Sequence, residues 1–293
     1  MIRADLHIHT IATPWDEPFD FNFEQLRQHI EENRLDVIAI TNHNTFDKAQ
    51  YEVVAQKLSD LCMVYPGVEV NALGCHILIV CKPEEAANLE LACSEVDKIL
   101  GGNIQASLDL NQLFVAFPSL NELIVIPHYE KNPAISLENL SELGEYVSAV
   151  EVSSLAKAIR LNKIHSLPHP AVFFTDYRFG CESADGARER YRPGGIYLKA
   201  ASKSFQAVRD AFNFDDLLLS ASGNDDFEFF PGATVISGMN LILGKRSTGK
   251  TFSLDRIFHF AAKAKHITSS KESSSTPVKR AAFIRTSPVA SRA

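Results

Sequence analysis

Residues 3–17, RADLHIHTIATPWDE, begin with a short apolar run that ends in two histidines separated by one isoleucine. Residues two apart on a strand point to the same side, so His7 and His9 would face one point in space. Two ligands of a single metal ion require this arrangement. The rest of the sequence decides whether other ligand types join them.

Short runs rich in Ile, Val and Leu recur along the chain and alternate with stretches of helical periodicity, a pattern typical of a mostly parallel α/β sheet or barrel. Residues 22–34 and 84–100 have the helical spacing. The apolar face of the second consists of Leu89, Cys93, Val96 and Leu100. Roughly seven such units over about 210 residues favour a barrel over an open sheet.

The composition fits a folded protein, since 45% of the 293 residues are apolar. We expect a cytoplasmic protein with no membrane partner, because no apolar run approaches the roughly 18 residues of a membrane span and no basic, apolar leader is visible. The five scattered cysteines are expected to be reduced thiols. From Lys245 onward bases dominate, whereas the remainder is acidic and argues against broad adhesion to nucleic acid. The basic end is either solvated or in contact with phosphates.

A Gly-, Asp- and Pro-rich break, ASGNDDFEFFPGAT, separates two kinds of sequence. The expected organisation is a barrel over residues 1–215, a linker over 216–231, the start of a nucleotide-binding unit over 232–264 and a disordered basic tail rich in Ser, Thr and Pro over 265–293.

Titratable side chains stand at the ends of the predicted strands. They are His7, His9, His43, Glu69, His76, His128 and Asp176. In a parallel barrel the carboxyl ends of the strands meet at one rim, so these side chains can share a pocket. Without a cation, carboxylates packed there would repel each other in partly dry surroundings. A single such histidine would most simply be a hydrogen-bonded core residue, but seven groups together predict a metal site.

The segments DLHIHT, AITNHNT, PGVEV, GCHILIV, IPH and FFTD follow one another in an order and at a spacing that resemble the polymerase and histidinol phosphatase (PHP) superfamily. The resemblance covers about residues 1–215 and implies a distorted (β/α)7 barrel that binds two or three divalent ions, either Mn, Zn or Fe. By position it implies one ion held by His7, His9, Glu69 and Asp176. It implies a second ion held by Glu69, His76 and His128, with Glu69 bridging.

For a third ion, the resemblance implies Asp16, His43 and a further histidine, but this chain has Arg178 at the last place. Arginine stays protonated and cannot ligate a metal. The third site is therefore either absent or held by Asp16, His43 and water or substrate. Arg178 would either grip a substrate phosphate or form a plain salt bridge. Asn42 stands where the family commonly has an aspartate, which would weaken the support of His43.

The chemistry follows from the ions, because two cations about 4 Å apart supply a bridging hydroxide at neutral pH and neutralise charge on phosphoryl oxygens. We expect a metal-dependent hydrolase of phosphoester bonds, with Glu69, Asp176 and Arg178 as catalytic residues and phosphodiesters of nucleic acid or nucleotides as the favoured substrates. The alternatives are a phosphatase of small phosphomonoesters and a catalytically inactive binding module. Tyr129 and Lys131 are candidates for a leaving-group acid, and could equally be surface residues.

The segment LILGKRSTGKT, residues 241–251, has the phosphate-binding loop pattern between an apolar run and a helical stretch. It resembles the start of an ABC/SMC-like ATPase domain, in which Gly244, Gly249, Lys250 and Thr251 would bind ATP with magnesium. The acidic strand end that such domains need does not follow, so the fold is expected to be incomplete. Weak or no ATP hydrolysis is expected, and a turnover abolished by Lys250→Ala would contradict this.

Overall fold

The structure of the protein is a computed structural model that describes residues 1–180, 195–220, 227–230, 233–235 and 251. The chain divides into two compact units, Met1–Gly223 and Asn224–Ala293. The described part of the second unit contains an antiparallel pair, β11 (Phe227–Phe230) and β12 (Ala233–Val235). The domain boundaries expected from the sequence stay predictions.

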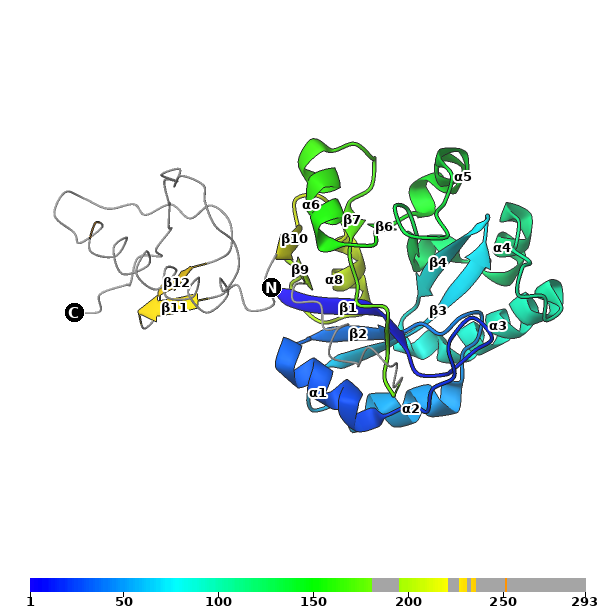
Figure 1. Ribbon diagram of the computed structural model, residues 1–293, viewed down its shortest axis with the longest axis horizontal. Coiled ribbons are helices and arrows are strands. Elements are labelled where there is room, and N and C mark those ends of the chain that lie inside the picture. The colour runs from blue at the N-terminus through cyan, green and yellow to red at the C-terminus, as the bar shows by residue number, and fades with distance from the viewer. Residues whose placement is uncertain (181–194, 221–226, 231–232, 236–250, 252–293) are drawn as a thin grey trace, which may run out of the picture. The chain divides into compact units, whose positions relative to one another are not determined.

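The first unit is built around one curled mixed sheet (Figure 1). Within the described ranges its strand order is β10-β9-β1-β2-β3-β4-β5, with β8 paired to β1 off this path. The strands are β1 (Ile2–His9), β2 (Val37–Ile40), β3 (Met63–Ala72), β4 (Cys75–Val80), β5 (Ile124–Pro127), β8 (Tyr177–Arg178), β9 (Gly195–Leu198) and β10 (Leu217–Ser220). Strands β1 to β5 coincide with apolar runs in the sequence.

Strand direction departs from the mostly parallel sheet that the sequence predicts. Strands β1, β2 and β3 are parallel, but β4 is antiparallel to both β3 and β5, and β9 is antiparallel to β1 and β10. The cause at β4 is a two-residue turn in which Leu73 and Gly74 have φ angles of 55° and 72°. Positive φ at both central residues is the geometry of a tight hairpin, so no crossover helix intervenes.

The sheet curls, but continuous strand pairing does not close it into the expected seven-stranded barrel within the described residues. Strands β6 (Val150–Glu151) and β7 (Ala171–Val172) form a separate parallel pair. A single bridge, between His128 and Glu151, connects the end of β5 to that pair. The structure therefore shows a mixed α/β fold with a half-barrel sheet.

Seven α-helices and three 3-10 turns lie in the described part of the first unit. They are α1 (Phe23–Asn33), α2 (Lys48–Lys57), η1 (Pro83–Glu85), α3 (Ala86–Leu100), α4 (Leu110–Ala116), η2 (Leu120–Glu122), α5 (Leu137–Leu143), η3 (Gly144–Tyr146), α6 (Leu155–Ile164) and α8 (Phe205–Asp210). Six of these helices begin after an Asn, Asp or Ser whose side chain accepts from a backbone N–H of the first turn. None of the described helices has the length and apolar character to cross a bilayer.

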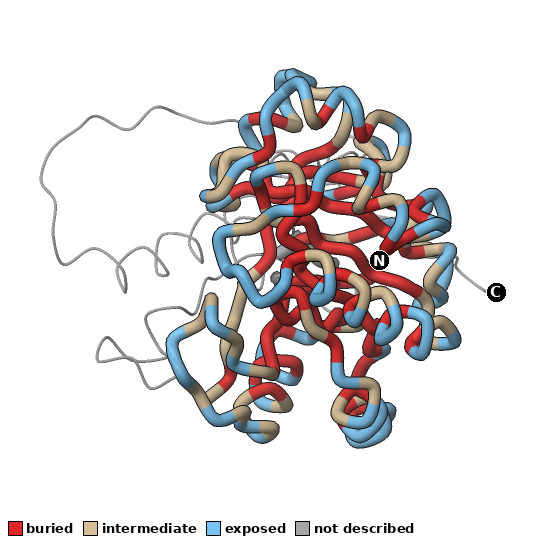
Figure 2. The backbone as a smooth tube through the Cα atoms, turned by 90° about the vertical axis from the view of Figure 1, so that its right-hand side faces the viewer, coloured by how far each residue is buried: buried red, intermediate tan, exposed pale blue. Residues whose placement is uncertain are grey.

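Core side chains pack on both faces of the sheet, so the strands are the most buried part of the first unit (Figure 2). Leu26 of α1 and Val96 of α3 pack in one cluster, and Val208 of α8 packs in the other. Strand β1 contributes Leu6 to the second cluster and Ile8 to the first, and its register with β2 shifts between Asp5 and Ile8. Such irregularities re-aim side chains, here at the end of β1 that carries the two histidines.

Candidate metal centre

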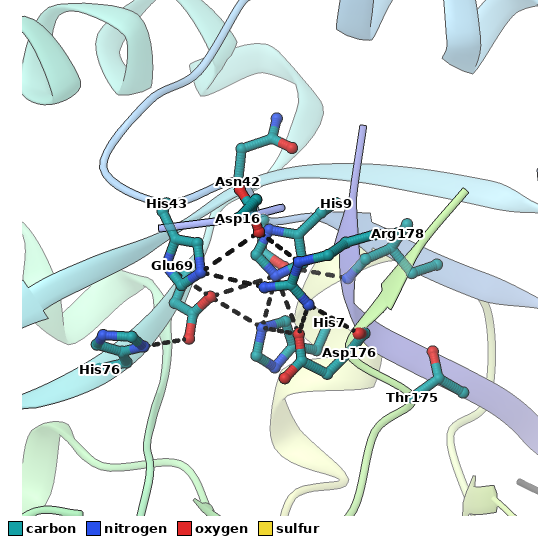
Figure 3. Close-up of polar contacts among 12 residues, drawn as sticks. His7, His9, Asp16, Asn42, His43, Glu69, His76, Thr175, Asp176 and Arg178 are labelled. Atoms are coloured by element: carbon teal, nitrogen blue, oxygen red, sulfur yellow. Dashed lines mark hydrogen bonds and ion pairs between the residues drawn. The ribbon is translucent and has the colours of Figure 1, made fainter. Parts of the chain in front are cut away.

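Seven titratable side chains that the sequence singled out lie together at one end of the sheet (Figure 3). His7 and His9 lie at the end of β1. His43 follows β2, and its backbone forms an isolated parallel β-bridge with Glu69 of β3. His76 lies near the start of β4, at the same end of the sheet because that strand runs backwards. His128 follows β5, and Asp176 precedes β8.

Glu69 lies at the centre of this cluster. Its Oε2 lies 3.0 Å from His7 Nε2, 3.3 Å from His9 Nε2 and 3.1 Å from His43 Nδ1. Its Oε1 lies 2.8 Å from His76 Nδ1 and 3.3 Å from His128 Nε2. The side chain is 1% exposed. Each carboxylate oxygen thus faces a different set of imidazoles, which is the geometry that a bridging ligand needs.

Asp176 faces the β1 histidines from the other side. Its Oδ1 lies 3.1 Å from His9 Nε2 and 3.3 Å from His7 Nε2. Its φ angle is 53°, a left-handed conformation that is uncommon outside glycine and clusters at functional sites. The preceding Thr175 donates its hydroxyl to Asp5 Oδ2 at 2.6 Å, which ties this turn to β1.

A cation of the protein, Arg178, lies beside Asp16 and His43, where the family resemblance implied a third ion. The Arg178 guanidinium donates to Asp16, to Asp176 Oδ1 at 2.7 Å and to His43 Nε2 at 3.2 Å. Figure 3 shows it among these groups. The side chain of the buried Asn42 accepts from the backbone N–H groups of Thr10 at 2.7 Å and Ile11 at 2.9 Å, so its hydrogen bonds order the chain after β1.

Two further residues belong to the cluster. Glu151 is fully buried and accepts from His7 Nδ1 at 2.8 Å, and its Oε2 lies 3.2 Å from His128 Nε2. Lys131 extends its ammonium to Glu151 Oε1 at 2.7 Å and to Asp176 Oδ2 at 3.1 Å. Sequence reasoning named Lys131 only as one of two candidate acids and missed Glu151. The sequence does contain a signal for Glu151, because the triplet Val-Glu-Val that contains Glu69 recurs at residues 150–152.

The pKa shifts follow from the charges packed here. Burial lowers the pKa of His7, but the carboxylates of Asp176 and Glu151 outweigh burial and raise it to about 10. Burial dominates at His43 and lowers its pKa to about 3. Burial raises the pKa of Glu69, yet the neighbouring His7 and His43 bring it well below its usual range. Glu69 is therefore ionised at neutral pH, and His43 is a neutral imidazole able to ligate.

The donor set fits divalent cations. Within the part of the chain that the structure describes, four groups of three ligand atoms have all their atoms within 4.8 Å of one another. They are His7, His128 and Glu151; His7, His9 and Glu69; His9, Asp16 and His43; and His43, Glu69 and His76. Among the described residues, several buried nitrogens, including His43 Nδ1 and His128 Nε2, have a carboxylate oxygen within 3.3 Å but no hydrogen bond of good geometry. A buried nitrogen without a partner is unfavourable, and a metal ion would satisfy it.

The remaining site predictions lie elsewhere. Gly244, Gly249 and Lys250 lie outside the described residues, and Thr251 is exposed and helical. The buried His29 of α1 bonds to Asn33 and lies 3.4 Å from Asp5, outside the cluster around Glu69.

No protein-family model and no curated protein matches the chain. Among solved structures, it is similar to a two-domain protein from Bacteroides vulgatus described as containing a predicted PHP-like metal-dependent phosphoesterase, with a TM-score of 0.53 and 12% identity. That match covers 75% of this chain and 65% of the other, so this chain spans less than two thirds of that protein. A protein from Bifidobacterium adolescentis named as a metal-dependent phosphoesterase candidate matches with a TM-score of 0.41 and 11% identity over 71% of this chain and 94% of its own. At such identities the first likeness shows the fold alone.

Proposed function

We propose that the protein is a metal-dependent hydrolase of phosphoester bonds, with its reaction centre at the rim around Glu69. The observation that carries the proposal is the bridging geometry of Glu69, whose two oxygens face separate sets of imidazoles within 3.3 Å. The similarity of fold to a protein described as a PHP-like metal-dependent phosphoesterase supports it. Divalent ions held there would activate water and neutralise charge on the phosphoryl oxygens.

The charge balance of the site fits such ions. Four carboxylates, Asp16, Glu69, Glu151 and Asp176, face two cationic side chains, Lys131 and Arg178. Without metal, protonated His7 leaves the cluster with one excess negative charge, and loss of that proton on metal binding leaves two. A buried excess of charge is unfavourable. Two divalent ions would reverse the sign and leave the centre attractive to a phosphoryl group. This makes the centre a site for two metals, with Arg178 in the place of a third.

We assign Arg178 to bind the phosphoryl group. Its guanidinium is 16% exposed, is held by Asp16, Asp176 and His43, and retains one Nη2 hydrogen that a phosphoryl oxygen can accept. Arginine keeps its charge throughout the reaction, so this contact is charge-assisted. Burial lowers the pKa of Arg178, but the two carboxylates raise it above its usual value.

Lys131 is assigned to the leaving-group side. Its ammonium is 13% exposed and lies between Glu151 and Asp176. Burial lowers its pKa, whereas the carboxylates of Glu151 and Asp176 raise it above the usual value, so it is charged at neutral pH. It therefore supplies a fixed positive charge rather than a proton. The other named candidate, Tyr129, packs against the core.

The substrate is expected to be a phosphodiester of nucleic acid or nucleotides or a small phosphomonoester. The test combines elemental analysis of the purified protein with turnover of a generic phosphodiester and a generic phosphomonoester in manganese. About two bound ions with turnover that His9→Ala abolishes are expected. Turnover by His9→Ala at the wild-type rate, or no turnover with two ions bound, would contradict the proposal.

A second candidate function is a catalytically inactive binding module. The observation that favours it is the pair of internal cations, since Lys131 and Arg178 already neutralise part of the acidic cluster without a metal. In that case elemental analysis would find less than one ion per chain, and no phosphoester would be turned over.

A further inference from the structure

We propose that the cavity beside His43 binds the organic part of the substrate, and that this part carries a flat aromatic ring. The inference rests on the proposed phosphoester hydrolysis, because it concerns the group to which the phosphoryl is attached. The cavity has a volume of about 430 Å³. Its walls are residues 11–15 after β1, residues 43–46 after β2, and the side of α3 with the segment that follows it. Ligand pockets commonly measure about 300–1,000 Å³, so a small organic group fits.

His43 joins this cavity to the metal centre. Its Nδ1 lies 3.1 Å from Glu69, and its Nε2 accepts from Arg178 at 3.2 Å. The same imidazole lines the cavity, where its ring centroid is 5.9 Å from that of Trp15 at an interplanar angle of 31°. A phosphoryl group held by Arg178 would therefore have its attached organic group beside Trp15.

The lining is suited to a ring without charge. Trp15 offers a partly exposed indole face, and Ile11, Phe46 and Ile104 add apolar surface. Aromatic rings stack on such faces with offset geometry, and the attraction does not depend on one particular base or ring. A purely aliphatic alcohol would gain the apolar contact but not the stacking.

Polar groups in the wall indicate a heteroaromatic ring. Asn44 is 8% exposed, and its side-chain NH₂ has no hydrogen-bond partner, while its Oδ1 accepts from the backbone N–H of Asn71 at 2.8 Å. Asn44 lines the cavity, and this NH₂ is covered in the absence of a ligand, so it would donate to a ring nitrogen or an exocyclic carbonyl only if the side chain turned towards the bound ring.

Charge argues against a long nucleic acid strand in this cavity. Glu90 and Asp97 line it, and none of the described lining residues is Lys or Arg. Grooves that bind a polynucleotide backbone are positively charged, because every nucleotide brings a phosphate. We infer a small phosphoester with one aromatic ring, of which nucleoside phosphates and aryl phosphates are the two sources.

Binding can be measured apart from catalysis, because Trp15 is the only tryptophan of the 293 residues. The full chain loaded with manganese is titrated with adenosine and, as the control that lacks the aromatic base, with ribose. Adenosine should change the Trp15 emission to saturation, and ribose should not. By calorimetry, Trp15→Phe should keep the adenosine affinity, and Trp15→Leu should weaken it roughly 10-fold, within the range of single stacking contacts. Equal binding of adenosine by wild type and Trp15→Leu would overturn the proposal.

Turnover supplies the second measurement. Phenyl phosphate and a nucleoside monophosphate are compared with glycerol phosphate, and Trp15→Leu should lower kcat/KM roughly 10-fold for the two aromatic substrates and less than about 2-fold for glycerol phosphate. The faster aromatic substrate identifies the source. An equal loss for all three, or preferred hydrolysis of an oligonucleotide, would overturn the proposal.

Two outcomes separate this inference from the proposed function. If adenosine binding depends on Trp15 but no phosphoester is turned over, the hydrolase is wrong and the subsite stands. If glycerol phosphate is turned over but adenosine does not bind, the subsite alone is wrong. A matched pair on α3 checks the location, since Ser94 lines the cavity, whereas Leu91 is 69% exposed and does not line it. Ser94→Phe should block adenosine, and Leu91→Phe should not.

Discussion

Replacing Arg178 with histidine should convert the proposed site for two metal ions into a site for three. His9, Asp16 and His43 already bring their ligand atoms within 4.8 Å of one another, and the guanidinium contacts both Asp16 and His43. An ion among these three ligands would lie within about 4 Å of the guanidinium charge, where two unit charges of like sign repel by about 4 kcal/mol at an effective dielectric constant of about 20.

For a divalent ion the repulsion doubles to about 8 kcal/mol, which is more than five powers of ten in affinity at about 1.4 kcal/mol per factor of ten. Arg178→His removes the repulsion and adds a fourth ligand. Arg178→Met, the control, removes the charge without adding a ligand.

The assay is elemental analysis after equilibration with manganese or zinc, together with the calorimetric affinity of the last ion to bind. We expect about two ions in wild type, about three in Arg178→His, and a weakly bound third ion in Arg178→Met. Three tightly held ions in wild type, or no gain in Arg178→His, would show that the guanidinium does not exclude an ion. Thermal unfolding of the metal-free variants checks that both fold.

Three further outcomes are expected. Thr175→Val removes the hydrogen bond to Asp5 and frees the left-handed turn at Asp176, so the affinity for the metals and kcat/KM should each fall roughly 10- to 100-fold, measured by calorimetry and steady-state kinetics. If both stayed unchanged, this positioning role would be ruled out. With a pKa of about 10, His7 stabilises the metal-free fold fully below its unfolded value of 6.5, and that stability is lost as the pH rises through 10. Metal binding at pH 7 should therefore release about one proton from His7 and tighten with pH, which calorimetry in buffers of different ionisation enthalpy measures; zero protons released would contradict the assignment. Gly67→Ala should lower the free energy of unfolding by about 1–3 kcal/mol, since a Cβ there would lie 2.8 Å from the methyl group of Thr41, the residue after β2. An unchanged denaturation midpoint would refute it.

The sequence predicted which side chains meet at the rim because each follows or ends an apolar run. His7, Glu69, His128 and Asp176 come together as that reasoning expects. It did not predict the direction of β4, because an apolar run carries no sign of its direction. The turn before it has Leu73 at a position that usually takes Asn or Gly, so the hairpin signal was weak.

Side-chain contacts were harder to predict. The residue type of Arg178 excluded a metal ligand, but its simultaneous bonds to Asp16, His43 and Asp176 depend on how the packed site orients the guanidinium. Glu151 was overlooked because a lone acid inside an apolar run resembles an ordinary strand residue. Only its burial beside His7 separates it from one.

The hairpin between β3 and β4 has a consequence for how the centre assembles. Glu69 and His76 are 7 residues apart in sequence, whereas His9 and Asp176 are 167 apart. Closing a short loop loses little chain entropy and is fast, and long loops close later. A folding chain would therefore offer an ion two ligands, Glu69 and His76, well before Asp176 is in place. Metal present during refolding should speed the early phase, and the slow docking of the Asp176 turn should complete the coordination of the ion.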